Sequence, residues 1–230
     1  MNFIVDGLRW FTDPAHYQGM DAVQARLFEH LELSGSAVLV AALIALPIGL
    51  GLGHAGRFEF AAVNVANIGR ALPSLALLGF ALPIAIALGL GLGFWPTFLS
   101  LIPLALPPIL TNAYVAVRNV DRDVVESARG MGLSEAQILG RIELALGMPL
   151  VLSGLRTASV NVVATATLGA IVASGGLGRY LVDGLALQEF DRLFAGAVLV
   201  ALLAIAVEAA FGLLARAVIS PGIRQGEGAF

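Results

Sequence analysis

The sequence predicts an all-α protein that crosses a membrane five times, with six crossings as the alternative. Hydrophobic residues make up 58% of the chain and charged residues only 13%, whereas soluble domains carry about 25% charged residues. The mean hydropathy is +0.89, and several charge-free stretches are long enough to cross a hydrocarbon core of roughly 30 Å as helices. Composition and span length together therefore place the chain among membrane proteins.

Charge-free stretches define the expected spans. They comprise residues 33–53, 71–117, 157–178 and 193–215, the last interrupted only by Glu208. Residues 71–117 are too long for one span, and they divide at residues 88–96, where glycines, a proline and a tryptophan are typical of a turn near the membrane surface. The span before this turn is expected to begin near Phe60 and to bend at Pro73. The expected number of spans is therefore five.

The arginines orient these spans. All 13 basic residues are arginine, and most lie in the loop after the first span, in the central loop and in the C-terminal tail. Five spans put these three regions on one side, which is cytoplasmic because cytoplasmic loops are enriched in basic residues. The expected parts are an extracytoplasmic segment at residues 1–32, a transmembrane domain at 33–219 and a cytoplasmic tail at 220–230. In the first part, Val23, Leu27 and Leu31 predict a short helix that lies on the membrane or packs on its own chain.

Composition also argues against several kinds of chemistry. The chain contains no cysteine, so thiolate metal sites and thiol nucleophiles are excluded. It contains no lysine, which a standard ATP-binding P-loop requires, and its three histidines show no spacing typical of metal ligands. The long uncharged stretches offer no cluster of catalytic groups, and the net charge of −3 does not favour nucleic-acid binding. We therefore expect neither an enzyme nor a cofactor held by this chain.

The central segment, residues 121–147, is polar. Burying its eight charged residues in lipid would cost on the order of 20 kcal/mol or more, at roughly 2.5–3.5 kcal/mol each, so it is expected to lie in water. Residues 123–130 read as a helix capped by Asp121 or Asp123, and Gly132 supplies a residue free to adopt positive φ and end it.

A second helix is expected directly after this turn. Ser134 and Gln137 form the S-x-x-Q pattern of a capping box, so the helix should begin at Glu135 and run toward Gly147, before Pro149 opens the next span. Small residues would let another protein approach closely, and four larger ones offer an apolar surface: Val125, Met131, Ile138 and Ile142. Periodicity alone leaves a second interpretation open, in which this pair is only a connecting loop.

The same segment resembles the EAA motif of ABC importer permeases, E-A-A-x-x-x-G followed after nine residues by I-x-L-P. The matching positions are Glu126, Ser127, Ala128, Gly132, Ile142 and Leu144, while Ala145 stands where the family has proline. In that family the helix pair docks into a groove of a separate ATPase subunit. The resemblance implies that these six residues form an ATPase-docking element and that a partner subunit binds ATP.

Further blocks are similar to the permeases of osmoprotectant importers. They include GRALPSLALLGFALP at residues 69–83, PPILTNAYVAVRNVD at 107–121 and ATLGAIVASGGLGRYLVDGL at 166–185. The resemblance implies an inner-membrane component of a binding-protein-dependent importer for glycine betaine, carnitine or choline. It further implies an ATP-binding subunit, a second permease chain (identical or related), an external solute-binding protein, and the cytoplasmic membrane of a bacterium or archaeon.

Two other function classes stay open at this stage. Methionine and other small-solute permeases share the five-span core, and an ion-gradient-driven secondary transporter would need no ATPase. For a solute path, one helix stripe and two residues of the preceding span are candidates: Ser153, Thr157, Asn161, Thr165, Asn112 and Tyr114. Such polar residues equally serve helix packing in membranes. Glu208 is expected to pair with a neighbouring span, and residues 179–192 are a candidate surface for the binding protein.

Overall fold

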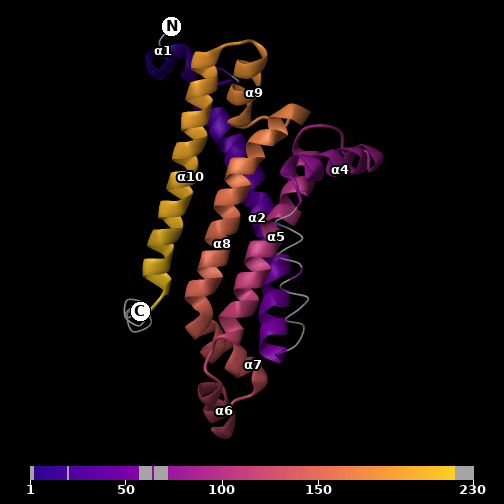
Figure 1. Cartoon of the computed structure of the whole chain (residues 1–230), viewed down its shortest axis with the longest axis vertical. Coiled ribbons are helices and arrows are strands. Elements are labelled where there is room, and N and C mark those ends of the chain that lie inside the picture. Colours follow the sequence, from indigo (N-terminus) through magenta and orange to yellow (C-terminus); the bar gives the residue numbers. More distant parts are fainter. Residues whose placement is uncertain (1–2, 20, 57–63, 65–71, 221–230) are drawn as a thin grey trace. The chain divides into compact units, whose positions relative to one another are not determined.

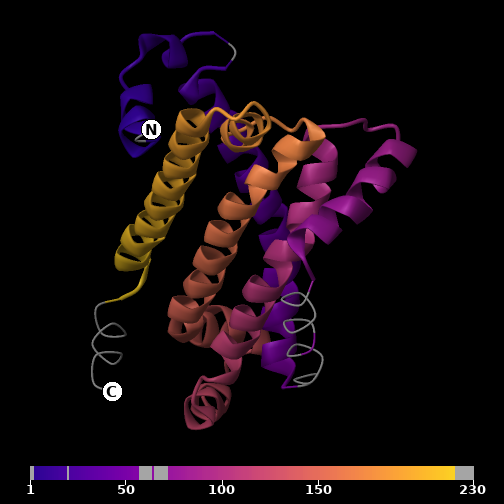
Figure 2. The same ribbon diagram turned by 45° about the horizontal axis from the view of Figure 1, so that its top comes forward.

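Long apolar helices make up the structure, a computed structural model that describes residues 3–19, 21–56, 64 and 72–220. Within these ranges all regular structure is helical and no strand occurs, which confirms the all-α prediction (Figures 1 and 2). The chain divides into two compact units. The first unit comprises residues 1–40, 72–104 and 159–207, and the second comprises residues 41–71, 105–158 and 208–230.

Four helical segments of the described chain are long and apolar enough to cross a membrane. They are α2 (Val23–Ala55), α5 (Phe94–Arg118), the continuous segment Glu135–Val172 that contains α8 (Leu144–Ala166), and α10 (Phe190–Val218). The shorter apolar helix α4 (Ser74–Ala87) covers the end of the second predicted span. The start of that span, near Phe60, lies outside the described residues. The multi-pass architecture is thus confirmed.

Two predicted helix boundaries differ from the structure. Val23, Leu27 and Leu31 do not form a separate short helix, because they are the first turns of α2. Arg26 in this region binds Asp21 and lies 2.8 Å from Glu29, so its charge does not interrupt the helix. Likewise α8 begins at Leu144, ahead of the predicted opening of the span at Pro149, and it accommodates Arg156, whose guanidinium lies 3.3 Å from Glu208.

The first unit has an aromatic core that the sequence analysis did not anticipate. Helix α1 (Phe3–Trp10) and the 3₁₀ turn η1 (Pro14–Tyr17) precede α2, and Trp10 packs edge-on against Tyr180 at 5.3 Å between ring centroids. Leu177 and Ala195 complete this buried cluster. Burial raises the pKa of Tyr180 to about 12, because a phenolate would lose its hydration there.

The predicted fourth span does not remain α-helical to its end. Helix α8 ends at Ala166 and continues as the 3₁₀ turn η3 (Thr167–Val172), which is followed by α9 (Gly178–Ala186). A Cβ added at Gly178 would lie 2.2 Å from the Thr167 carbonyl oxygen, so the chain folds back on itself at contact distance. In the same unit, the Nε2 atom of buried His30 lies 2.9 Å from the Val163 carbonyl oxygen.

In the second unit, glycines let α2, α5 and α8 approach backbone to backbone, and the three helices run side by side (Figures 1 and 2). A Cβ added at Gly49 would lie 2.6 Å from the Leu110 carbonyl oxygen. One added at Gly147 would lie 2.6 Å from the Ala116 carbonyl oxygen. Small residues serve such contacts because packing, rather than hydrophobic transfer, drives helix association in membranes.

Candidate functional site: the helix pair at residues 121–147

The first helix of the central segment, α6 (Arg122–Gly130), has the predicted cap and turn. Of the two candidate caps, Asp121 is used, and its Oδ1 accepts a hydrogen bond of 2.9 Å from the Asp123 amide. After the helix, Gly132 has φ +87°, a conformation that residues with a Cβ rarely adopt. The Leu133 amide then donates to the Ala128 carbonyl at 3.2 Å. These contacts fix a sharp turn.

The second helix begins as predicted but does not end where predicted. Helix α7 (Glu135–Ile138) has the full capping box, in which the Ser134 amide donates to Gln137 Oε1 at 2.9 Å. A π-helical turn, η2 (Leu139–Glu143), then leads directly into α8. Pro149 lies inside α8, so it does not mark a break. The helix pair and the following span are therefore mechanically continuous.

The six predicted docking residues differ in exposure. Glu126, Ser127 and Gly132 are exposed, Ile142 and Leu144 are half-buried, and Ala128 is buried. The Ala128 backbone carbonyl accepts the bond that closes the turn. A partner can therefore reach the exposed residues but not the buried Ala128 side chain.

The apolar surface of the pair is also smaller than expected. Met131 is 73% exposed, but Ile138 is fully buried and belongs to the interior. Val124, which sequence reasoning missed, is 42% exposed. It stands beside Val125, and only the phase of a nine-residue helix decides which of the two faces water, so the sequence carried little signal.

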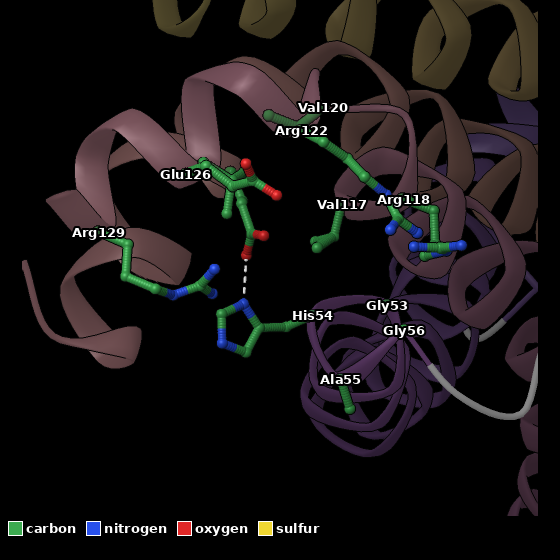
Figure 3. Close-up of a pocket in the computed structure, with 12 residues that line it drawn as sticks. Gly53, His54, Ala55, Gly56, Val117, Arg118, Val120, Arg122, Glu126 and Arg129 are labelled. Atoms are coloured by element: carbon green, nitrogen blue, oxygen red, sulfur yellow. Dashed lines mark hydrogen bonds and ion pairs between the residues drawn. The ribbon is translucent and has the colours of Figure 1, made fainter.

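Behind this surface, four charged or polar side chains form a series, and Figure 3 labels two of them, His54 and Arg129. The Arg129 guanidinium donates to both oxygens of Glu135, at 2.7 and 2.9 Å. The other members are His54, whose Nε2 lies 3.2 Å from Glu135 Oε2, and Glu143, whose Oε2 lies 2.6 Å from His54 Nδ1. The bond to Glu135 raises the pKa of Arg129 above its ordinary value. We call these four residues the charged network.

A cavity of about 290 Å³ adjoins the charged network (Figure 3). It is lined by the end of α2, by the end of α5 and by α6, and its charged lining residues are Arg118, Arg122, Glu126, Arg129 and Glu143. No group of three or more metal-ligating side chains occurs in the part of the chain that the structure describes. A cavity of mixed charge at the base of an exposed helix pair suits contact with a polar protein surface.

The structure separates the candidate path residues into two groups. On α8, Thr157 and Asn161 are exposed, while Ser153 and Thr165 are half-buried. Thr157 Oγ1 donates to the Ser153 carbonyl at 2.9 Å, so its hydroxyl is bonded within its own helix. Helix packing within the described chain therefore leaves Thr157 and Asn161 uncovered, whereas it partly covers Ser153 and Thr165.

The two candidates on α5 contact their own chain instead. Asn112 is half-buried, its Nδ2 donates to the Pro108 carbonyl at 2.8 Å, and a Cβ added at Gly154 would lie 2.6 Å from its Cβ. Tyr114 is only 4% exposed. These contacts favour the packing interpretation for both residues.

Glu208 forms the expected pair with a neighbouring helix, since its Oε1 lies 3.3 Å from Arg156. In the first unit, four of the charged residues at 179–192 are also paired: Arg179, Asp183, Glu189 and Arg192. The Asp183 carboxylate forms ion pairs with the guanidinium groups of Arg179, at 3.0 Å, and of Arg192, at 3.2 Å. The exposed side chains left in this segment include Leu185, Leu187 and Phe190, so its free surface is largely apolar.

The fold and the helix pair define a class of protein, a polytopic all-α membrane protein whose apolar helices are separated at one point by an exposed, polar helix pair. Comparison with known families gives the particular assignment. The family model for the binding-protein-dependent transport system inner membrane component matches residues 37–220, and the chain belongs to this family. It is therefore a transport permease component and not an enzyme.

Individual relatives are similar over nearly the whole chain. A carnitine transport permease of Listeria monocytogenes is 35% identical over 86% of this chain and 88% of its own length. A choline transport system permease of Bacillus subtilis is 32% identical over 87% and 90%. An inward-facing structure of the MetNI methionine ABC transporter matches with a TM-score of 0.73, at 21% identity, over 84% of this chain and 94% of that one. The last similarity shows the fold alone.

Membership of this family also bears on partners and location. A binding-protein-dependent permease works with an ATPase and with a solute-binding protein, and the family is an inner-membrane component. Together with the four apolar helices of the described residues, this makes the chain a multi-pass membrane protein.

Proposed function

We propose that this chain is the transmembrane subunit of an ATP-driven importer for a small osmoprotectant such as glycine betaine, carnitine or choline. The proposal is supported by the permeases to which the chain is similar, which are named for carnitine and choline transport. The importer would lie in the cytoplasmic membrane of a bacterium or archaeon. Residues 179–192 are the surface that we propose for the external binding protein.

A single observation carries the coupling mechanism: the helix pair at residues 121–147 is rigidly capped and yet exposed at its tip. Asp121, the Ser134–Gln137 box and Gly132 fix its shape through local bonds. The exposed residues Glu126 and Met131 then present an acidic and an apolar group to a partner. The residues that we propose for docking are Glu126, Ser127, Gly132, Ile142 and Leu144. Ala128 contributes to the shape of the pair.

The proposed cycle is alternating access. Two permease chains, identical or related, enclose a path to which the exposed stripe at Thr157 and Asn161 contributes. ATP is bound by the partner ATPases, since this chain has no lysine for a P-loop. Closure of the ATPases moves the helix pairs, and α8 carries this movement into the membrane because it continues from the pair without a break.

The test is co-purification of the ATPase subunit in mild detergent, followed by uptake of radiolabelled glycine betaine into proteoliposomes. Glu126→Arg and Gly132→Asp should both lose the ATPase while remaining folded. Matched controls are Asp6→Arg, an exposed acid of α1, and Gly130→Asp, an exposed glycine that lies in α6, and both should retain it. Uptake that needs an ion gradient but no ATPase would instead identify a secondary transporter.

A further inference from the structure

One histidine connects the end of α2 to the helix pair. His54 is the next-to-last residue of α2, and its side chain is 19% exposed. Its Nδ1 lies 2.6 Å from Glu143 Oε2, and its Nε2 lies 3.2 Å from Glu135 Oε2. Ionised carboxylates only accept hydrogen bonds, so both ring nitrogens face acceptors and one side chain joins two parts of the pair.

The local structure places Glu143 specifically for this contact. Glu143 is the last residue of the π-helical turn η2, and its side chain is only 6% exposed. A buried carboxylate is costly unless it is paired and hydrogen-bonded. Single π-helical turns interrupt helices most often at functional positions. The turn therefore places an acid beside His54 at the point where the pair becomes the span α8.

The charged network continues from His54 to the docking surface. Glu135, the first residue of α7, receives two hydrogen bonds from Arg129 of α6. Arg129 lies three residues after Glu126, the leading docking residue, on the same helix. A displacement of α6 by a partner is thus passed through Arg129 and Glu135 to His54 by charge-assisted hydrogen bonds, which are the stronger kind.

The end of α2 is held too closely to absorb such a displacement by sliding. A Cβ added at Gly53, next to His54, would lie 2.7 Å from the Tyr114 carbonyl oxygen of α5. Close-packed interfaces of this kind switch between discrete arrangements rather than deforming continuously. A pull on His54 therefore moves the inner end of α2 together with α5.

We propose that His54 is a positioning residue that transmits movement of the helix pair to the first span through its contacts with Glu143 and Glu135. This inference rests on the proposed function, because it assigns a second route of coupling in the same importer. Helix α8 is moved directly by the pair, and α2 is moved through His54. Without His54, ATP hydrolysis continues while the first span responds incompletely, so more ATP is consumed for each solute imported.

The experiment measures the number of ATP molecules hydrolysed per glycine betaine imported, in proteoliposomes that contain the permease, its ATPase and the binding protein. His54→Leu should raise this ratio about fivefold or more, the lower end of typical couplings between sites, while ATPase co-purification stays unchanged. His16→Leu is the matched control, since His16 also faces a carboxylate, Asp13 at 3.9 Å, but in the first unit. It should leave the ratio unchanged.

Two further variants separate transmission from folding. His54→Arg should keep the wild-type ratio. Arginine can donate to both Glu143 and Glu135, and the adjoining cavity leaves room for it. Glu143→Gln tests the same contact with almost no change of volume and should also raise the ratio, including where His54→Leu fails to assemble. Because the two residues act through one contact, the double variant should be no worse than either single one.

Two results would overturn the inference: an unchanged ratio in both His54→Leu and Glu143→Gln, or an equal rise in His16→Leu. Failure of the proposed function looks different. In that case the wild-type proteoliposomes themselves show no ATP-driven uptake, whatever stands at position 54, and the inference falls with it.

Discussion

Gly132 shows how one residue sets the shape of the helix pair that we propose for docking. Its φ of +87° turns the chain between α6 and α7, and a Cβ at this position would meet nothing within 4 Å. The requirement for glycine here is therefore conformational rather than steric. Gly130, two residues earlier, is equally open but lies in α6 with ordinary helical geometry. The two glycines provide a controlled comparison.

At this scale we predict that Gly132→Ala weakens binding of the ATPase subunit by about 5–30-fold, which corresponds to one or two kcal/mol. The strain of a left-handed alanine would be relieved by opening the turn, so the docking surface loses its shape. Gly130→Ala should bind as well as wild type, because alanine favours the helix. Titration of the ATPase onto permease in nanodiscs measures both. Equal weakening by the two variants would contradict the role of the turn.

At the scale of elements, the second unit depends on how closely α5 and α8 approach. Gly147 lies near the start of α8, and a Cβ there would be 2.6 Å from the Ala116 carbonyl oxygen. Gly140, in the π-helical turn just before, has open space around it. One glycine is therefore a packing requirement and the other is not, although they stand seven residues apart in one helical segment.

We predict that Gly147→Ala costs about 1–3 kcal/mol, as overpacking of a close contact usually does, because the backbone carbonyl of Ala116 has no room to move aside. Gly140→Ala should be neutral or slightly stabilising, since glycine in a helix is unfavourable relative to alanine. Thermal unfolding in detergent should show a lower transition temperature for Gly147→Ala alone. A transition unchanged from wild type would mean that the two helices can separate at low cost.

Sequence reasoning succeeded for elements whose determinants lie within one turn of the chain. The Asp121 cap, the Gly132 turn and the Ser134–Gln137 box each depend on neighbours two to three residues apart, and all three are present. The fold class followed from composition for a similar reason, because span length is a local property. Local patterns, however, say nothing about which elements meet.

The misses share that physical cause. His54 and Glu143 are 89 residues apart in sequence, and no periodicity links them. The partner of Glu208 could not be named from the sequence, and the structure shows that it is Arg156. Ile138 was assigned to the exposed face although it is fully buried, because a local pattern does not say which neighbours cover a side chain. Long-range partners decided each of these outcomes.

For the molecule as a whole, the surface of α8 points to an environment other than lipid. Arg156 and Glu208 remain 45% and 49% exposed as side chains although they pair, and charged groups in contact with lipid are expensive. Thr157 and Asn161 lie on α8 with Arg156 and are exposed too, whereas Glu208 belongs to α10. A face with this composition suits water or a second permease chain, whereas the exposed apolar side chains of α10, such as Leu202, suit lipid.

We therefore predict that Thr157→Cys reacts with a water-soluble, membrane-impermeant thiol reagent and that Leu202→Cys, 56% exposed in wild type, does not. The chain has no cysteine of its own, so each variant carries a single thiol, and only the thiolate formed in water reacts readily.

Labelling of inside-out and right-side-out vesicles, with and without ATP and binding protein, measures the exposure of the thiol on each side of the membrane. Alternating access requires that ATP change the labelling of Thr157→Cys in opposite directions in the two vesicle types. Labelling of Leu202→Cys as fast as Thr157→Cys, or a Thr157→Cys thiol that stays unreactive under all four conditions, would remove the α8 stripe from the solute path.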